Sequence, residues 1–577
     1  MRSLFFLLLF GFLLEGLPAQ KGDSLPHPPL LDRLRLSGNF GELRPGHFHS
    51  GLDLKTNGNT GKPVTAIRKG QVSRIKIQEG GYGRTLYIDH PNGNTSVYAH
   101  LKRFAHPIRR FLRQVQYEQE QGPIDLYPGE GILSVERGDT IAFSGNSGSS
   151  GAPHLHFEIR KTVSEQPIDP LLLGFDVFDR RAPRFHGLRL IQWNEKGEKE
   201  SKVRSTRKVG EQAYQPSAGK LIKWGRTQRL RFSVRVTDRA SGTRNPLGVR
   251  ALQAYIDGKL YYSVHFDTLD FSNRSYFEAH IDHPYLYKEG RAYHRCHVLP
   301  HNELSIYEKE AENSPFFHPI RDSIHRVRVE ASDRHGNLSV LRFRFVSKKK
   351  ASNDPPNGEE QNGTELNCRW REASHHRSEE LELTIPPKAL YQDHTLLIRS
   401  DSSRDEHELS PDHTVHDPSI PLQKPFKARI RLDTLPPGSK EKLYILSEDP
   451  KWGVRVYEAH HKDGWAVGKV KRFGELSVRV DSSSPRIRPL RTQEKIPKAE
   501  KTRFRFRVKD DLSGIESYEA YLGNRWRIPY YDRKNDLIIV RVSDPLKPLS
   551  EGVGKFELKV RDRAGNETSF IKKLRVE

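Results

Sequence analysis

Cysteine is almost absent from this chain of 577 residues, which contains only Cys296 and Cys368. These two residues do not form a zinc-finger pattern, which excludes a cysteine-bound structural metal site. A disulfide between them is possible in an oxidising compartment, but sequence alone cannot show whether they lie close together.

Long apolar runs are also scarce, and the one that occurs lies at the N-terminus, over residues 4–10. A small-residue segment follows and predicts a secretory signal peptide over residues 1–19, cleaved after Ala19. Gly11 and Glu15 interrupt the run, which argues against a permanent anchor, and no cysteine near Ala19 indicates a lipoprotein. No second run follows, so we expect an exported mature chain without a stable membrane span, in the periplasm or cell envelope.

Acidic residues are outnumbered, with 73 Asp and Glu against 96 Lys and Arg, a formal net charge of +23 and a pI of about 9.7. Such a surface favours polyanionic partners. No recognised nucleic-acid motif occurs, and export disfavours nucleic acid, so an anionic cell wall or outer envelope fits better. A basic surface that only keeps the protein soluble is the alternative.

Two short stretches, residues 49–53 and 154–158, hold a complete set of nitrogen and oxygen metal ligands. In a strand, alternate side chains point to the same face. The second stretch would therefore present its two histidines and Glu158 on one face and its apolar residues on the other. Spacing alone does not decide which of His154 and His156 binds a metal.

The first stretch follows the same alternation, with His49, Gly51 and Asp53 on one face. Gly51 has no side chain, so we expect a metal to approach between His49 and Asp53. Two imidazoles and one carboxylate leave a fourth position for water, which is typical of catalytic rather than structural zinc.

Strand-like runs and turn signals divide the chain into mainly β domains. Residues 31–178 form the predicted catalytic domain, in which short β-rich runs alternate with Gly- and Asn-containing turns. A helical segment breaks this rhythm, and we interpret residues 103–137 as an insertion beside the site, acting as a lid.

Two regions behind the catalytic domain, residues 179–346 and 485–577, repeat one pattern. Each opens with a strand and an Asp…Ser-Gly turn, and each closes with a strand and an Asp-Arg-x-Gly-Asn turn. The pattern predicts a repeated, Ig-like β-sandwich. Between them, residues 347–379 are interpreted as a polar linker and residues 380–484 as a further β-rich domain.

Four motifs together resemble a known family: His-Ser-Gly-Leu-Asp at 49–53, Tyr-Ala-His-Leu at 98–101, Ser-Gly-Asn-Ser-Gly at 144–148, and Pro-His-Leu-His-Phe-Glu at 153–158. They look like those of the LytM/lysostaphin-type zinc metallopeptidases, over about residues 31–175. The full architecture is similar to exported multi-domain members from Bacteroidetes-type bacteria.

The resemblance implies a role for each position. His49, Asp53 and His156 match the zinc ligands, whereas His100 and His154 match the two catalytic histidines that do not bind the metal. It further implies a zinc endopeptidase that cleaves peptide cross-links of peptidoglycan, with the β domains positioning it on the wall or on envelope protein partners. The alternative is a catalytically silent activator or scaffold for other wall hydrolases, which the intact five positions disfavour.

Overall fold

The computed structural model describes residues 25–194, 199–225, 227–348, 363–401, 409–496 and 502–576. The predicted signal peptide over residues 1–19 lies outside this range. Within the described residues, no helix is long and apolar enough to cross a membrane.

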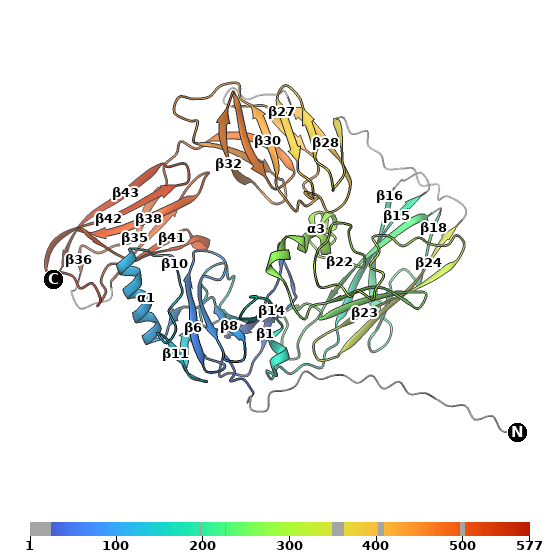
Figure 1. Cartoon of the computed structure of the whole chain (residues 1–577), viewed down its shortest axis with the longest axis horizontal. Helices are drawn as coiled ribbons and strands as arrows, with labels where there is room; N and C mark the ends of the chain where they lie inside the picture. Colours follow the sequence, from blue (N-terminus) through green and yellow to red (C-terminus); the bar gives the residue numbers. More distant parts are fainter. Residues whose placement is uncertain are drawn as a thin grey trace.

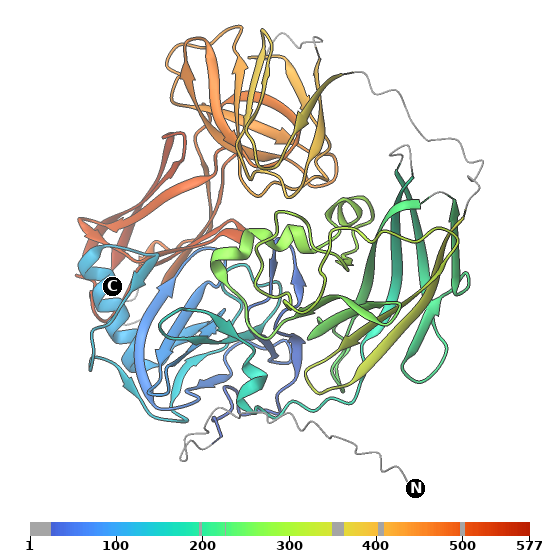
Figure 2. The same cartoon turned by 45° about the vertical axis from the view of Figure 1, so that its right-hand side comes forward.

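The protein is mainly β, as predicted, and its domains follow one another around an arc (Figure 1). The last domain returns to lie against the first, which both views show (Figure 2). Lys534 Nζ donates to the Ser150 carbonyl at 2.8 Å, and the rings of Tyr117 and Trp526 meet at 5.9 Å. The first and last domains therefore pack together.

The first domain is built on a nine-stranded antiparallel sheet in the order β1-β4-β13-β8-β7-β6-β10, with β11 and β14 at its margins. A small sheet β5-β12-β9 and a hairpin β2-β3 complete it. Its elements are β1 (Leu36–Gly38), β2 (Leu43–Arg44), β3 (His47–Phe48), β4 (Leu52–Lys55), β5 (Pro63–Thr65), β6 (Gly70–Ile77), β7 (Arg84–Asp89), β8 (Asn94–Ala99), β9 (Arg103–Phe104), α1 (His106–Gln119), β10 (Ile124–Leu126), β11 (Ser134–Val135), β12 (Thr140–Phe143), β13 (His154–Lys161), β14 (Pro167–Ile168) and the 3₁₀ turn η1 (Pro170–Leu173).

The register of three central strands positions the histidine motifs. His156 of β13 lies opposite Asp53 of β4 on one side and opposite Ala99 of β8 on the other. Leu155 and Phe157 alternate with the histidines and are fully buried in the core. Because the apolar face fixes this register, the motifs meet on one face of adjacent strands.

Residues 103–137 are part of the first domain rather than a lid. The helical segment is α1, whose Ile108 and Leu112 are buried in the domain core. The other elements of this range, β9, β10 and β11, pair with strands of the domain's sheets. No residue of this fully described range lines the cavity at the histidine motifs, so the predicted lid position is wrong. The apolar face of α1 draws it onto the core and away from the site.

The second domain is a ten-stranded sheet in the order β21-β20-β23-β24-β17-β16-β15-β19-β22, with β18 beside β24. Phe48 of β3 packs into its core against Phe266 and Phe277, which joins the first two domains. The elements are β15 (Arg184–Asn194), β16 (Lys199–Lys208), β17 (Ala213–Pro216), β18 (Leu221–Gly225), β19 (Thr227–Thr237), β20 (Ala251–Ile256), β21 (Lys259–His265), η2 (Phe271–Tyr276), α2 (Phe277–His280), α3 (His283–Glu289), β22 (His294–Arg295), β23 (Ile324–Ser332) and β24 (Leu338–Lys348).

The third domain is a single ten-stranded antiparallel sheet in the order β25-β28-β29-β34-β31-β32-β33-β30-β27-β26, and its end strands β25 and β26 lie in contact, as in a barrel. The elements are β25 (Thr364–Cys368), β26 (Ser374–Arg377), β27 (Leu381–Ile385), β28 (His394–Asp401), β29 (Asp412–Val415), β30 (Phe426–Arg431), β31 (Leu443–Glu448), β32 (Arg455–Lys462), β33 (Trp465–Val470) and β34 (Gly474–Val480).

The prediction of a linker over residues 347–379 is wrong for its C-terminal part, because β25 and β26 belong to the third domain. Cys368 and Leu366 pack into that domain's core, whereas the strands' other side chains are polar. This polarity hid the strands from sequence analysis. Residues 349–362 of the predicted linker lie outside the described range.

The C-terminal domain contains two facing sheets, β35-β37-β41-β40 and β36-β43-β42-β38-β39. The Ig-like character of this domain and of the second stays a prediction. Cys296 and Cys368 are buried in different cores and both are free. The elements are β35 (Arg486–Arg491), β36 (Lys495–Ile496), β37 (Arg503–Lys509), β38 (Ile515–Leu522), β39 (Arg525–Trp526), β40 (Pro529–Asp532), η3 (Arg533–Asn535), β41 (Leu537–Arg541), β42 (Gly552–Asp562) and β43 (Glu567–Val576).

Candidate metal centre

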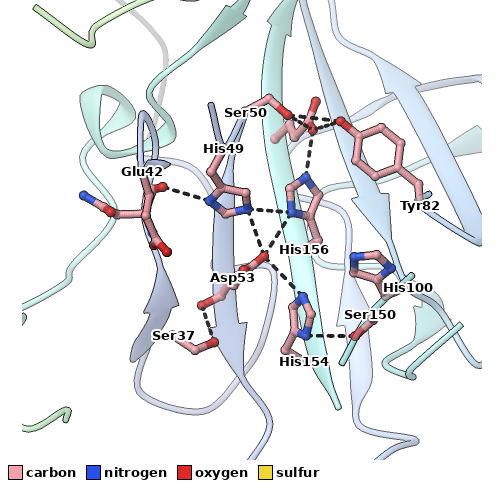
Figure 3. A network of polar contacts seen from close by, with 12 residues as sticks. Ser37, Glu42, His49, Ser50, Asp53, Tyr82, His100, Ser150, His154 and His156 are labelled. Atoms are coloured by element: carbon pink, nitrogen blue, oxygen red, sulfur yellow. Dashed lines mark hydrogen bonds and ion pairs between the residues drawn. The ribbon is translucent and has the colours of Figure 1, made fainter. Parts of the chain in front are cut away.

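Three side chains from the two motif stretches converge on one point (Figure 3). His49 Nε2, His156 Nδ1 and Asp53 Oδ1 form a triangle in which each side is 3.0 Å. All three residues are buried, with exposures of 5%, 3% and 6%. This group can hold a metal ion.

Hydrogen bonds on the far side of each imidazole decide which nitrogens carry lone pairs. His49 Nδ1 lies 2.8 Å from the Asn39 carbonyl, which can only accept, so the proton is on Nδ1 and Nε2 faces the triangle as an acceptor. His156 Nε2 lies 2.7 Å from Glu158 Oε1, so its Nε2 is the donor to that carboxylate. A neutral His156 therefore adds a second nitrogen acceptor opposite Asp53, and three acceptors at 3.0 Å require a cation between them.

The pKa of His156 also indicates that this site favours a positive charge. Burial would lower its pKa, but hydrogen bonds to Asp53 and Glu158 outweigh burial and raise the pKa of His156 to about 9. Burial opposes ionisation of Asp53 too, yet the surrounding histidines hold the pKa of Asp53 well below its usual range. The centre stabilises positive charge, whether it is a proton on His156 or a metal ion.

A fixed network orients Glu158 behind His156. Its side chain is fully buried and accepts hydrogen bonds from the Ser50 hydroxyl at 2.6 Å and from the Tyr82 hydroxyl. Arg160 pairs with its second oxygen at 2.7 Å, and this pair helps to hold the pKa of Glu158 below its usual range against burial. Such partners fix the tautomer and angle of a metal-binding imidazole.

Arg44 holds the second oxygen of Asp53. Its Nη2 donates to Asp53 Oδ2 at 2.8 Å, while its Nε pairs with Glu42 Oε1 at 3.0 Å. This contact leaves Asp53 Oδ1 to face His49, His156 and His154.

His100 and His154 stand beside the triangle, with their rings 4.9 Å apart. His100 Nδ1 lies 2.9 Å from the Ser147 carbonyl, and His154 Nδ1 lies 2.8 Å from the Ala152 carbonyl. His100 Nδ1 therefore carries the proton, which leaves its Nε2 atom as an acceptor. His154 Nε2 lies 3.2 Å from Asp53 Oδ1, a carboxylate oxygen that only accepts. Burial, with the neighbouring His156 and His154, lowers the pKa of His100 to about 3. His100 also has a φ of +56°, a conformation that costs energy and is typical of functional sites.

The site opens into a cavity of about 760 Å³ that the first two domains line together. The second domain contributes one wall, with Phe271, Arg274 and residues 304–306. Arg160 lies over the Phe271 ring at 4.6 Å and ties this wall to the floor of the site.

The structure brings all five predicted positions together. It shows a different reason why a glycine is needed at position 51. A Cβ at Gly51 would lie 2.4 Å from the Phe157 carbonyl oxygen and 2.8 Å from Glu158 Cγ. Gly51 thus lets β13 approach, and it does not open a path for the metal. Sequence reasoning missed the role of Ser50, although it lies within the first motif, because its partner Glu158 is 108 residues away. It also missed Tyr82 and the wall of the second domain, because no local pattern connects them to the motifs.

Comparison with known proteins identifies two regions. Residues 47–117 match the family model of peptidase family M23. The chain carries an M23 metallopeptidase domain of the LytM/lysostaphin type. Residues 366–481, which hold the strands of the third domain, match the family model of a Zu5-like domain.

Curated relatives match the M23 region. The chain is 32% identical over 142 residues to a protein from Neisseria meningitidis named "DD-carboxypeptidase/endopeptidase Mpg", covering 24% of this chain and 26% of that protein. It is 28% identical over 159 residues to an "Uncharacterized metalloprotease" from Haemophilus influenzae, covering 26% and 27%. The match thus spans about a quarter of each relative's length.

Among solved structures, the chain is similar to the catalytic domain of lysostaphin from Staphylococcus simulans, with 24% identity and a TM-score of 0.18, covering 23% of this chain and 88% of that domain. A zinc-containing peptidase from Vibrio cholerae matches at 23% identity and a TM-score of 0.20, covering 26% and 39%.

Proposed function

We propose that this protein is an exported zinc endopeptidase that hydrolyses peptide cross-links of peptidoglycan in the cell envelope. The observation that carries the proposal is the convergence of three lone-pair donors on one point, with two more histidines beside it, at the floor of a cavity. The name of the Neisseria meningitidis relative, a carboxypeptidase and endopeptidase, supports this reaction class. The predicted signal peptide supports export.

Zinc fits the three ligands, His49, Asp53 and His156. Imidazole and carboxylate at 2.0–2.2 Å from a tetrahedral zinc lie about 3.3 Å apart, close to the 3.0 Å sides of the triangle. Three protein ligands leave one position for water or substrate, as in catalytic sites. When bound, zinc polarises a peptide carbonyl and makes water a stronger nucleophile at neutral pH.

His100 and His154 handle protons in this proposal. The Nε2 atom of His100 carries a lone pair that can accept a hydrogen bond from the attacking water. A neutral imidazole accepts a proton from the attacking water, and a protonated imidazole stabilises the developing oxyanion or donates to the leaving amine. His154 presents its Nε2 atom 3.2 Å from Asp53 Oδ1 and shares these tasks.

The cavity is suited to an acidic peptide. Among its cationic residues, Arg44, Lys76 and Arg160 form ion pairs with carboxylates of the first domain. Arg274 is exposed on the opposite wall, where its guanidinium can meet a carboxylate of the peptide stem. We expect Arg274→Ala to raise KM by about 5- to 30-fold with little change in kcat.

Mass spectrometry of muropeptides after digestion of purified sacculi tests the proposal. The zinc-loaded full chain should release uncrosslinked muropeptides, and His49→Ala and Asp53→Ala should abolish release. His106→Ala, at an exposed histidine of α1, is the matched control. Full cleavage by both ligand variants would overturn the assignment. Stimulation of another wall hydrolase by a protein that binds no zinc would favour the silent-activator alternative.

A further inference from the structure

A second kind of carboxylate cluster occurs twice in this chain, far from the M23 site. In the C-terminal domain, Asp481, Asp510 and Asp562 place one oxygen each within 4.8 Å of one another. In the second domain, Asp179 and Asp333 are equally close, together with His335. Asp238 is electrostatically coupled to both carboxylates of that cluster.

The two clusters occupy the same place in the two domains. One carboxylate, Asp179 or Asp481, lies in the segment that leads into the domain, five residues before the first residue of β15 or β35. A second, Asp238 or Asp510, directly follows β19 or β37. The third comes at the end of β23 or β42, as Asp333 or Asp562.

Their hydrogen bonds also correspond. The backbone amides of Ser241 and Ser513 each donate at 2.9 Å to the leading carboxylate, Asp179 and Asp481 respectively. The amides of Asn337 and Asn566 each donate at 2.8 Å to Asp333 and Asp562. The chain therefore places corresponding carboxylates at two domain junctions, and in the second domain Asp179 and Asp333 form the close group together with His335.

One carboxylate oxygen of Asp238 and one of Asp510 remain without a hydrogen-bond partner. Asp238 is only 4% exposed, and its Oδ1 atom is buried without a hydrogen-bond partner. The Oδ1 atom of Asp510 is likewise buried and unpartnered. A buried carboxylate oxygen without a partner costs free energy, and neighbouring negative charges add to that cost.

We propose that each cluster binds a hard divalent cation, calcium, which ties the leading segment to the ends of two strands. Calcium takes six to eight oxygen ligands at 2.3–2.6 Å, and two oxygens on one ion can lie up to about 5 Å apart. The shared ligands are carboxylate oxygens, which favour calcium over zinc.

The geometry supports the C-terminal cluster most directly. Asp481 and Asp562 are 2% and 0% exposed, and Asp481 directly follows the last strand of the third domain. In the second domain, the third member of the close group is His335 rather than a carboxylate. We therefore expect tighter binding at the C-terminal cluster than at the cluster of the second domain.

Calorimetric titration of the zinc-loaded full chain with calcium chloride tests the proposal. We expect about two binding sites per chain, one in Asp510→Asn or Asp238→Asn, and none in the double variant. Asp511→Asn is the matched control, because Asp511 is exposed and pairs with Arg486.

Thermal unfolding provides a second readout that does not depend on heats of binding. Millimolar calcium should raise the Tm of the wild type and of Asp511→Asn and leave that of the double variant unchanged. Sacculus cleavage by the double variant should persist, which separates this proposal from that of the M23 site. Absence of calcium binding by the wild type, or undiminished binding by the double variant, would overturn the proposal.

Discussion

Two clusters of buried histidines lie in neighbouring domains and have opposite electrostatic surroundings. In the first domain, His49 and His156 meet Asp53, with Glu158 behind them. In the second domain, His280 Nε2 lies 2.9 Å from His294 Nδ1, and His280 Nδ1 lies 3.0 Å from the Tyr307 hydroxyl. Among the described residues, no carboxylate contacts His280 or His294.

The difference teaches what converts a buried histidine pair into a metal centre. Burial lowers the pKa of His294 to about 4 and holds that of His280 well below its ordinary value, so this pair stays neutral. Carboxylates raise the pKa of His156 to about 9 instead. Buried carboxylates and an adjoining cavity, rather than paired imidazoles, therefore distinguish the candidate metal centre.

Removing the Asp53 carboxylate should have the largest effect on the difference between the two histidine clusters. Asp53→Ala removes the carboxylate ligand between the two buried histidines, so we expect loss of zinc and at least a 10³-fold loss of sacculus cleavage. Zinc content by elemental mass spectrometry and muropeptide release measure the two effects. His280→Gln should retain zinc, and its failure to do so would show that the second pair supports the metal.

His100 tests whether a histidine of the first cluster can act without holding the metal. His100→Ala should keep a full equivalent of zinc and lose about 10²- to 10⁴-fold in kcat, because it removes a proton acceptor and no ligand. Zinc content and initial cleavage rates would be measured on the same sample. Loss of zinc together with activity would move His100 into the ligand set.

A substitution at Glu158 tests how much its hydrogen bond to the zinc ligand His156 contributes to zinc affinity. Glu158→Gln keeps the shape but weakens the hydrogen bond to His156 Nε2, and we expect a 10- to 100-fold loss of zinc affinity. Competition with a zinc chelator measures this change. An unchanged affinity would make Glu158 a purely structural strand residue.

The buried pair His280 and His294 should make the free energy of unfolding depend on pH. Its lowered pKa values mean that the unfolded chain binds protons below pH 6.5 that the folded domain does not. The stabilisation is therefore complete above pH 6.5 and is lost as the pH falls towards 4. For His294 the loss between pH 7.5 and 5 is about 2 kcal/mol.

Urea unfolding of the wild type and of His294→Gln at the two pH values measures this term. The variant should be less stable at pH 7.5 and should lose less stability on acidification. An equal loss in both proteins would assign the acid sensitivity to other groups.

Sequence analysis could single out His49, Asp53, His154 and His156 because strand alternation and short motifs are local. The selection of His100 and the division into ligands and catalytic histidines rested on the family resemblance. The alternation of His154 and His156 with Leu155 and Phe157 follows from one buried face. The strand-rich character of the later domains could be predicted for the same reason, from turns that recur at fixed places.

Other features depend on segments far apart in the chain and left no local signal. The wall formed by Phe271 and Arg274 faces the site because the first two domains pack together, with Phe48 in the second domain's core. The apolar face of α1 indicated a helix but not the surface on which it packs. The strand β25 carries too few apolar side chains to be distinguished from a linker.

Anomalous diffraction at the zinc absorption edge from crystals of the zinc-loaded full chain tests the central claim most directly. We predict a strong peak bounded by His49 Nε2, Asp53 Oδ1 and His156 Nδ1, and none between His280 and His294. A peak at the second pair, or none at the first, would contradict the account.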